Sequence, residues 1–122
     1  MMDRWGLEKK DLRPKNSGTG KKEVYSVRIT ETPHGRIISV CDIELLGKKF
    51  VEKDVILDIS REYYQGEPME ESEIVNLANE SQMISFVGRR SVSLAIKHKL
   101  IHPQAVLKVK GTPYAMFIKT TL

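Results

Sequence analysis

Two adjacent arginines after a glycine form the clearest candidate for ligand chemistry in this chain. Gly88, Arg89 and Arg90 stand where an apolar helical pattern begins, in the stretch "SFVGRRSVSLAIKHKLIHP". The first N–H groups of a helix lack intrahelical partners, and two guanidinium groups beside them suit a phosphate. On a helical wheel Arg90 falls on the outer side and Arg89 nearer the packed side. The alternative is a glycine needed for close packing, followed by solvated arginines.

Metal binding is the chemistry that the histidines suggest. His98 and His102 are four residues apart, the spacing by which two imidazoles meet on one helical face. Pro103 ends the helix there, and the remaining soft ligands, His34 and Cys41, are distant in sequence. We therefore expect no metal, and two histidines that are solvated or cap the helix end.

Nucleophilic and acid–base catalysis are also poorly supported. Cys41 lies six or seven positions along a strand from His34, which separates them by roughly 20 Å at about 3.3 Å per residue. Glu70 and Glu71 suit a helix N-terminus, where acids already have a structural role. The chain contains neither G-x-x-x-x-G-K-[ST] nor G-x-G-x-x-G. We expect no catalytic residue and no cofactor.

Composition predicts a soluble protein with one folded domain. The chain has 122 residues, of which 40% are hydrophobic and 30% charged, and no apolar run approaches the roughly 20 residues of a membrane span. No secretory signal is recognisable at the N-terminus, and a single cysteine fits a reducing compartment. These features indicate a cytoplasmic protein without a membrane partner.

Charge is distributed unevenly along the sequence. Residues 1–22 have a net charge of +4, residues 23–41 balance, residues 42–80 have −7, and residues 81–122 have +7 without any acid. Such asymmetry favours an anionic partner, with nucleic acid first. The candidate contacts in the last third are Arg90, Arg89, Lys97, Lys108, Lys110 and Lys119, with Tyr114 as a stacking aromatic. The candidates in the N-terminal tail are Trp5, Arg13, Lys15, Lys21 and Lys22.

Hydrophobic periodicity predicts an α+β domain over residues 23–122, preceded by a basic N-terminal extension over 1–22. Short β-branched runs indicate extended segments, and Pro33 with Gly35 favours a hairpin turn. The extended runs are 24–30, 36–41, 45–50, 54–60, 105–110 and 114–119. The result is a small, mostly antiparallel sheet built of hairpins, with two helices in the order ββββααββ.

The two helices are placed by their apolar faces and ends. Pro68 at a first helical position and the glutamates after it predict a helix over about 68–80. A second helix should begin near Gly88 and stop before Pro103. Its predicted core side chains are Val92, Ala95, Ile96 and Leu100, and its predicted outer side chains are Arg90, Ser93 and Lys97.

Several stretches of the chain resemble one family. They include "VCDIELLGKKF", "DVILDISREYYQGEP", "SFVGRRSVSLAIKHKLI" and "VLKVKGTPYAMFI". Together, over about residues 24–119, they look like the small archaeal family named domain of unknown function four-two-four. The matching signature comprises Cys41, Asp42, Glu44 to Lys48, Phe50, Tyr64, Gly66, Val87, Gly88, Gly111 and Pro113.

The resemblance implies an archaeal cytosolic protein with a suspected RNA-binding role in translation, and it implies no established reaction. The chain departs from the family where members often show an acid after the glycine and a histidine after the proline. It has Arg89 and Tyr114 there, so the site is more basic and histidine chemistry at the final hairpin is in doubt.

We therefore expect a non-enzymatic RNA-binding protein of the archaeal translation apparatus, ribosomal or ribosome-associated. It would bind rRNA phosphates, and neighbouring ribosomal proteins would be further partners; no DNA is expected. One alternative is an enzyme or small-ligand protein that acts on RNA or a nucleotide near Gly88, with Asp42 and Arg90 at its site. Another is a protein–protein adaptor that uses the acidic helix and the tail.

Overall fold

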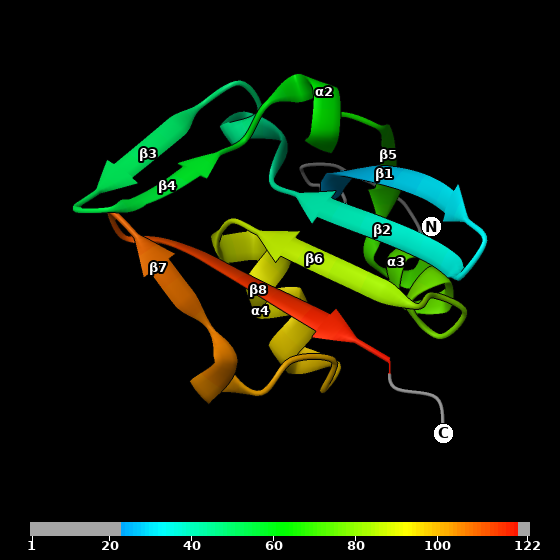
Figure 1. The fold of residues 1–122 in the computed structure, drawn as a ribbon. Helices are drawn as coiled ribbons and strands as arrows, with labels where there is room; N and C mark the ends of the chain where they lie inside the picture. Colours follow the sequence, from blue (N-terminus) through cyan, green and yellow to red (C-terminus); the bar gives the residue numbers. More distant parts are fainter. Residues whose placement is uncertain (1–22, 120–122) are drawn as a thin grey trace, which may run out of the picture.

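A six-stranded sheet with two helices on one face forms the centre of the molecule (Figure 1). The computed structural model describes residues 23–119. The strand order is β5-β1-β2-β6-β8-β7, and a separate hairpin pairs β3 with β4. The strands are β1 Val24–Thr32, β2 Gly35–Cys41, β3 Lys49–Glu52, β4 Val55–Asp58, β5 Glu67–Glu70, β6 Met83–Val87, β7 Leu107–Val109 and β8 Thr112–Ile118. The helices are α2 Arg61–Tyr64, α3 Glu71–Ala78 and α4 Arg89–Lys97, with short 3-10 helices η1 Ile43–Leu45 and η2 Pro103–Ala105.

Alternation along the strands builds the main core. Tyr25 and Val27 of β1 and Ile38 and Val40 of β2 all point to the helix side and are buried. Phe86 of β6 lies in the same layer and is fully buried. The helices cover this face with their own apolar side chains, which are Ile74 and Ala78 from α3 and Val92, Leu94 and Ala95 from α4. Burial of this layer supplies the main stabilisation of the domain.

A second, smaller core lies on the opposite face of the sheet, at the end where β2 and β6 finish. The β3–β4 hairpin folds over that end and contributes Leu57, next to Cys41 and Val87 of the sheet. Tyr114 of β8 packs against the same cluster and is half-buried. The second core fixes the position of the loop that follows β2, and that loop carries Asp42.

The α+β class and the mostly antiparallel sheet are confirmed, whereas the predicted order ββββααββ is wrong. Residues 67–70 form strand β5 on β1, where a helix start was expected, so α3 begins only at Glu71. Strand β6 lies parallel to β2 and was not predicted, nor was the one-turn helix α2. Lys110 and Gly111 make the final hairpin turn, which leaves Thr112 and Pro113 in β8.

Helix α4 agrees with the sequence at its start and differs at its end. Gly88 is its N-cap, Val92 and Ala95 are buried, and Ile96 and Leu100 pack partly buried against the core. The helix ends at Lys97 rather than before Pro103. No helix within residues 23–119 is long and apolar enough to cross a membrane.

Lys99 explains the earlier end of α4 and gives a stability prediction. It has φ +59°, while the N–H of Leu100 reaches back to the carbonyl of Ala95, a C-terminal cap that favours glycine. Lys99→Gly should therefore raise the free energy of unfolding by about 1 kcal/mol because it relieves the left-handed strain. Urea denaturation would measure the gain. The neighbouring Lys97→Gly, inside the helix, should lower the free energy of unfolding by a similar amount, about 1 kcal/mol.

Candidate nucleic-acid interface and the grooves beside α4

Asp42 caps the start of α4 from a buried position after β2. Its side chain is 3% exposed. Oδ2 accepts from the N–H of Arg90 at 3.0 Å, and Oδ1 accepts from the N–H and Oγ of Ser91 at 2.8 and 2.7 Å. Gly88 has φ +107°, and a Cβ built on it would lie 2.3 Å from Cγ of Asp42. The N–H groups of Arg90 and Ser91, which were expected to be free at this helix start, are therefore already used within the protein.

Arg90 is committed to internal contacts. Its guanidinium binds Glu44 through two nitrogens, at 2.7 and 3.3 Å, and donates to the carbonyl of Val24 at 3.3 Å. Glu23 lies 3.6 Å away, and the Tyr25 ring centroid is 5.1 Å from the guanidinium carbon. The hydrogen bond from Arg90 lowers the pKa of Glu44 below its usual value. Arg90 thus joins η1 and β1 to α4.

Arg89, by contrast, is exposed, so the helical-wheel placement of the two arginines is reversed in the structure. It borders a groove of about 280 Å³ that Ser93 and Lys97 also line. On its other side a groove of about 310 Å³ brings it next to Lys110 and Gly111 of the β7–β8 turn. The fold therefore gathers Arg89, Arg90 and Lys110 around the start of α4, with Lys97 at the end of the same helix.

The remaining candidates in the last third lie elsewhere. Lys119 follows β8 beside Gln82, at the end of β6 opposite to Gly88, and its Nζ donates to the carbonyl of Asn79 at 3.1 Å. Lys108 is exposed in the edge strand β7. Tyr114 packs in the second core, so its ring is only partly available for stacking. These three side chains do not extend the basic surface at α4.

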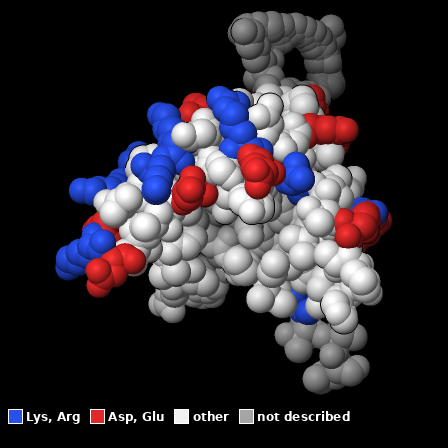
Figure 2. All heavy atoms as spheres, turned by 45° about the horizontal axis from the view of Figure 1, so that its top comes forward, with Lys and Arg blue, Asp and Glu red and all other residues white. Residues whose placement is uncertain are grey.

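Trp5, Arg13, Lys15, Lys21 and Lys22 lie outside the described residues. The described chain begins at Glu23, whose carboxylate lies beside Arg90, so the basic N-terminal segment is attached at the α4 grooves. Residues 23–119 carry equal numbers of acidic and basic side chains, which leaves the whole net charge of +4 to residues 1–22. Figure 2 agrees, since basic and acidic side chains are interspersed on the face that it shows.

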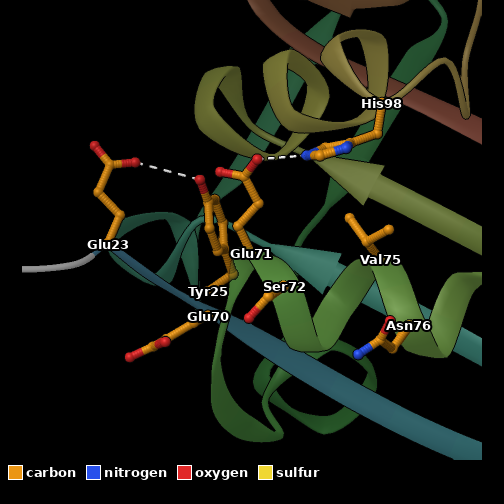
Figure 3. A pocket seen from close by; sticks show the side chains of 8 residues that line it. All are labelled: Glu23, Tyr25, Glu70, Glu71, Ser72, Val75, Asn76 and His98. Atoms are coloured by element: carbon orange, nitrogen blue, oxygen red, sulfur yellow. Dashed lines mark hydrogen bonds and ion pairs between the residues drawn. The ribbon is translucent and has the colours of Figure 1, made fainter. Parts of the chain in front are cut away.

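A third groove, of about 610 Å³, was not anticipated from the sequence. It lies between the start of β1, α3 and the end of α4 (Figure 3). Glu71 is its central side chain: it binds the imidazole of His98 and lies 3.0 Å from Nζ of Lys97. These two contacts, the imidazole first, lower the pKa of Glu71. In the sequence only the acidic start of α3 indicated a possible site here. The groove could not be predicted because its walls come from β1, α3 and the end of α4, which are distant in sequence.

Tyr25 separates the third groove from the one that Arg89 borders. Its ring is buried and its hydroxyl donates to Glu23 at 3.2 Å. Burial, with the neighbouring Glu23 carboxylate as a second cause, raises the pKa of Tyr25 to about 12. The phenol is therefore a neutral hydrogen-bonding group at physiological pH.

The histidines and the cysteine have structural partners. His102 Nδ1 accepts from the N–H of Gln104 and so caps η2. Cys41 is fully buried, and burial raises its pKa to about 12, which keeps the thiol protonated. Among residues 23–119 no group of three or more His, Cys, Asp or Glu side chains is arranged to hold a metal ion.

A family model described as "Protein of unknown function (DUF424)" matches residues 29–120. The chain belongs to this family. The match covers all three helices and the sheet except for the first part of β1, and it includes Asp42 and Gly88. No curated protein matches the chain.

A solved structure shares the fold of this DUF424 chain. It is the crystal structure of an uncharacterized conserved protein from Methanopyrus kandleri, with a TM-score of 0.62 and 20% sequence identity. The similarity covers 81% of this chain and 96% of that chain. At this identity it supports the architecture alone.

Proposed function

We propose that this protein is an RNA-binding protein of the archaeal translation apparatus that contacts phosphates through the exposed side of α4 and the N-terminal segment. One observation carries the proposal. The N-terminal segment, which holds the whole net positive charge, is joined to the domain at Glu23, which lines the same groove as Arg89 and Lys97. The point of attachment of the basic segment therefore lies beside the exposed basic side chains of α4, as binding along one nucleic-acid strand requires.

Arg89 and Lys97 are the contacts that the folded domain offers. Both are exposed, and both line the groove of about 280 Å³ that Glu23 also borders. Lys97 keeps 67% of its side chain exposed although it is paired with Glu71, so a phosphate can still reach its ammonium group. Lys110 would extend the contact on the other side of Arg89.

The binding mode that fits this surface is electrostatic. Lysines and arginines would neutralise phosphates and release counterions, with little reading of sequence. The folded domain, which has no net charge, would orient the protein on the RNA, and the basic N-terminal segment would contribute most of the affinity. The proposed setting is the ribosome in the cytoplasm, with rRNA as the RNA, neighbouring ribosomal proteins as further contacts and no reaction catalysed.

The enzyme alternative has one observation in its favour, because Asp42 and Arg90 line one groove and Gly88 lies against Asp42. The hydrogen bonds of Asp42 and Arg90 argue against an enzymatic role for them. Both oxygens of Asp42 accept hydrogen bonds from α4, and the Arg90 guanidinium is held by Glu44, so neither side chain is available to act on a ligand.

Removing the two exposed α4 charges should weaken RNA binding. The double variant Arg89→Gln and Lys97→Gln is expected to bind single-stranded RNA about tenfold more weakly and to lower the salt slope by about 1.4, since each lost phosphate contact contributes about 0.7. Fluorescence anisotropy with labelled RNA over a salt series measures both. The matched control is Lys48→Gln with Lys49→Gln, which removes the same charge at exposed sites by β3.

Equal losses in the two double variants would refute α4 as the contact surface. The ribosomal setting has a separate test, because the protein should sediment with ribosomal subunits at low salt and be released by raised salt. Sedimentation as a free monomer at low salt would contradict it.

A further inference from the structure

Every carboxylate that lines the third groove already has a partner within the protein. The pairs are Glu23 with Arg90, Glu71 with Lys97 and His98, and Glu70 with Glu73 in a capping box at the start of α3. A further cation would have to compete with these partners, and an anion would meet the carboxylates. The lining of the groove therefore suits an uncharged ligand.

The groove also contains hydrogen-bonding atoms that the fold leaves unused. The side chains of Ser72 and Asn76 are exposed and form no hydrogen bond with another residue of the described chain. Glu71 holds both of its partners with Oε2, so Oε1 accepts no hydrogen bond from residues 23–119. A hydroxyl, an amide and a carboxylate oxygen on neighbouring turns of α3 offer mostly acceptors, together with the amide donor. These atoms match a ligand that donates from an amino group.

Val75 and the imidazole of His98 give the groove a surface for a flat ring. In Figure 3 the two side chains lie at the same end of the lined space, and Glu71 holds the imidazole from one side. Histidine is one of the side chains on which the bases of single-stranded RNA stack. The groove volume of about 610 Å³ lies within the range of small-ligand sites, about 300–1,000 Å³.

The third groove continues into the groove of the proposed phosphate contacts. Both grooves are lined by Glu23, Tyr25 and Glu71. Lys97 stands at their boundary, because its Nζ lies 3.0 Å from Oε2 of Glu71 and its side chain lines the phosphate groove. A phosphate bound by Lys97 would therefore have its own nucleotide beside the third groove.

We propose that the third groove binds an adenine base of single-stranded RNA while Arg89 and Lys97 bind the neighbouring phosphates. The inference rests on the proposed RNA binding and adds a base preference to it. The Asn76 amide would accept from the N6 amino group and donate to N7, the pairing that amide side chains make with adenine. Oε1 of Glu71 would accept the second N6 hydrogen, and the ring would stack on His98. Uracil has no amino group and would leave these acceptors unused.

Free nucleosides test the base site without any phosphate. Adenosine added to the full-length protein should shift the NMR signals of Val75, Asn76 and the His98 ring, and uridine and cytidine should bind about tenfold more weakly. Asn76→Ala should weaken adenosine binding about tenfold. Asn79→Ala is the matched control, since it removes the same side-chain amide at an exposed position of α3's C-terminal end outside the groove, and it should leave adenosine binding unchanged.

Short labelled oligo(A) and oligo(U) test the same site in RNA. Asn76→Ala should lower the affinity for oligo(A) about tenfold relative to that for oligo(U). It should leave the salt slope of both unchanged because it removes no charge. Arg89→Gln with Lys97→Gln should lower the salt slope for both RNAs, so the base contact and the phosphate contacts have separate readouts.

The outcomes distinguish the base site from RNA binding. Equal binding of adenosine and uridine, or equal effects of the two alanine variants, would overturn the adenine site. RNA that binds with the expected salt slope, but with an oligo(A) to oligo(U) affinity ratio that Asn76→Ala does not change, would overturn the base site and leave RNA binding standing. Adenosine binding without any affinity for RNA would overturn the proposed RNA function and leave the groove as a nucleoside site.

Discussion

Asp42→Ala is expected to lower the free energy of unfolding by about 3–5 kcal/mol, because each buried donor left without an acceptor costs about 1–3 kcal/mol. Three donors depend on this one carboxylate: the N–H groups of Arg90 and Ser91 and the hydroxyl of Ser91. Asp42 and Ser91 are almost fully buried, so water cannot replace the lost acceptor. The loss should also free the start of α4, and with it the placement of Arg89.

Urea denaturation of Asp42→Ala, Asp42→Asn and Ser91→Ala measures this effect. Asparagine keeps one acceptor oxygen and the same shape, so Asp42→Asn should lose about half as much stability as the alanine variant. Ser91→Ala removes only the Ser91 hydroxyl, which is one of the three donors, and should lower the free energy of unfolding by only about 1 kcal/mol. A loss for Asp42→Ala no larger than that for Ser91→Ala would show that the cap is unimportant.

Local signals sufficed for the hairpins and for α4. The β1–β2 hairpin follows from β-branched runs around Pro33, and the start of α4 at Gly88 follows from the apolar spacing of Val92 and Ala95. In each case the residues that determine the element lie within it. The sequence-based prediction therefore succeeded for these elements, although it missed the one-turn helix α2 and the end of α4.

The two missed strands required such partners. The residues of β5 were predicted as a helix start because Pro68 is followed by acidic residues. In the structure this segment pairs with β1 instead, with Val24 opposite Glu70. Strand β6 is only five residues long and has Ser85 in its middle. It becomes a central strand because β2 and β8 pair with its two edges, which no local pattern reveals.

The charges of the site show the same dependence on tertiary structure. The last third of the chain contains no acid, and this suggested one continuous basic face. In the folded chain, acidic side chains of residues 42–80 lie against the basic last third. Glu44 binds Arg90, 46 positions away in the sequence, and Glu71 lies against Lys97. The basic surface is thus reduced to a few side chains around Arg89.

The signature that the chain shares with its family has an architectural reason at these positions. Asp42 caps α4, and Gly88 leaves room for that carboxylate where a side chain would collide with it. Residues that bind a partner are therefore better sought among the exposed side chains that the scaffold positions. Arg89 is one of these.

Gly66→Ala is the second substitution with a large expected effect, because a methyl group has no space there. A Cβ built on Gly66 would lie 2.0 Å from the carbonyl oxygen of Val27 and 2.7 Å from Cα of Arg28, both backbone atoms of β1. Gly66 also donates its N–H to Oγ of Ser26 at 2.9 Å, and that hydroxyl donates to the carbonyl of Tyr64 at 3.1 Å. The contact holds the end of α2 and the start of β5 against β1.

The clash can be relieved only by moving β5 off β1, so we expect a loss of at least about 3 kcal/mol in the free energy of unfolding. Gly111→Ala is the control, since Gly111 has φ +79° but no atom within 4 Å of its Cβ position. It should cost only about 1 kcal/mol of backbone strain. Thermal or urea denaturation compares the two, and equal losses would show that backbone strain, not the close approach of Gly66 to β1, limits stability.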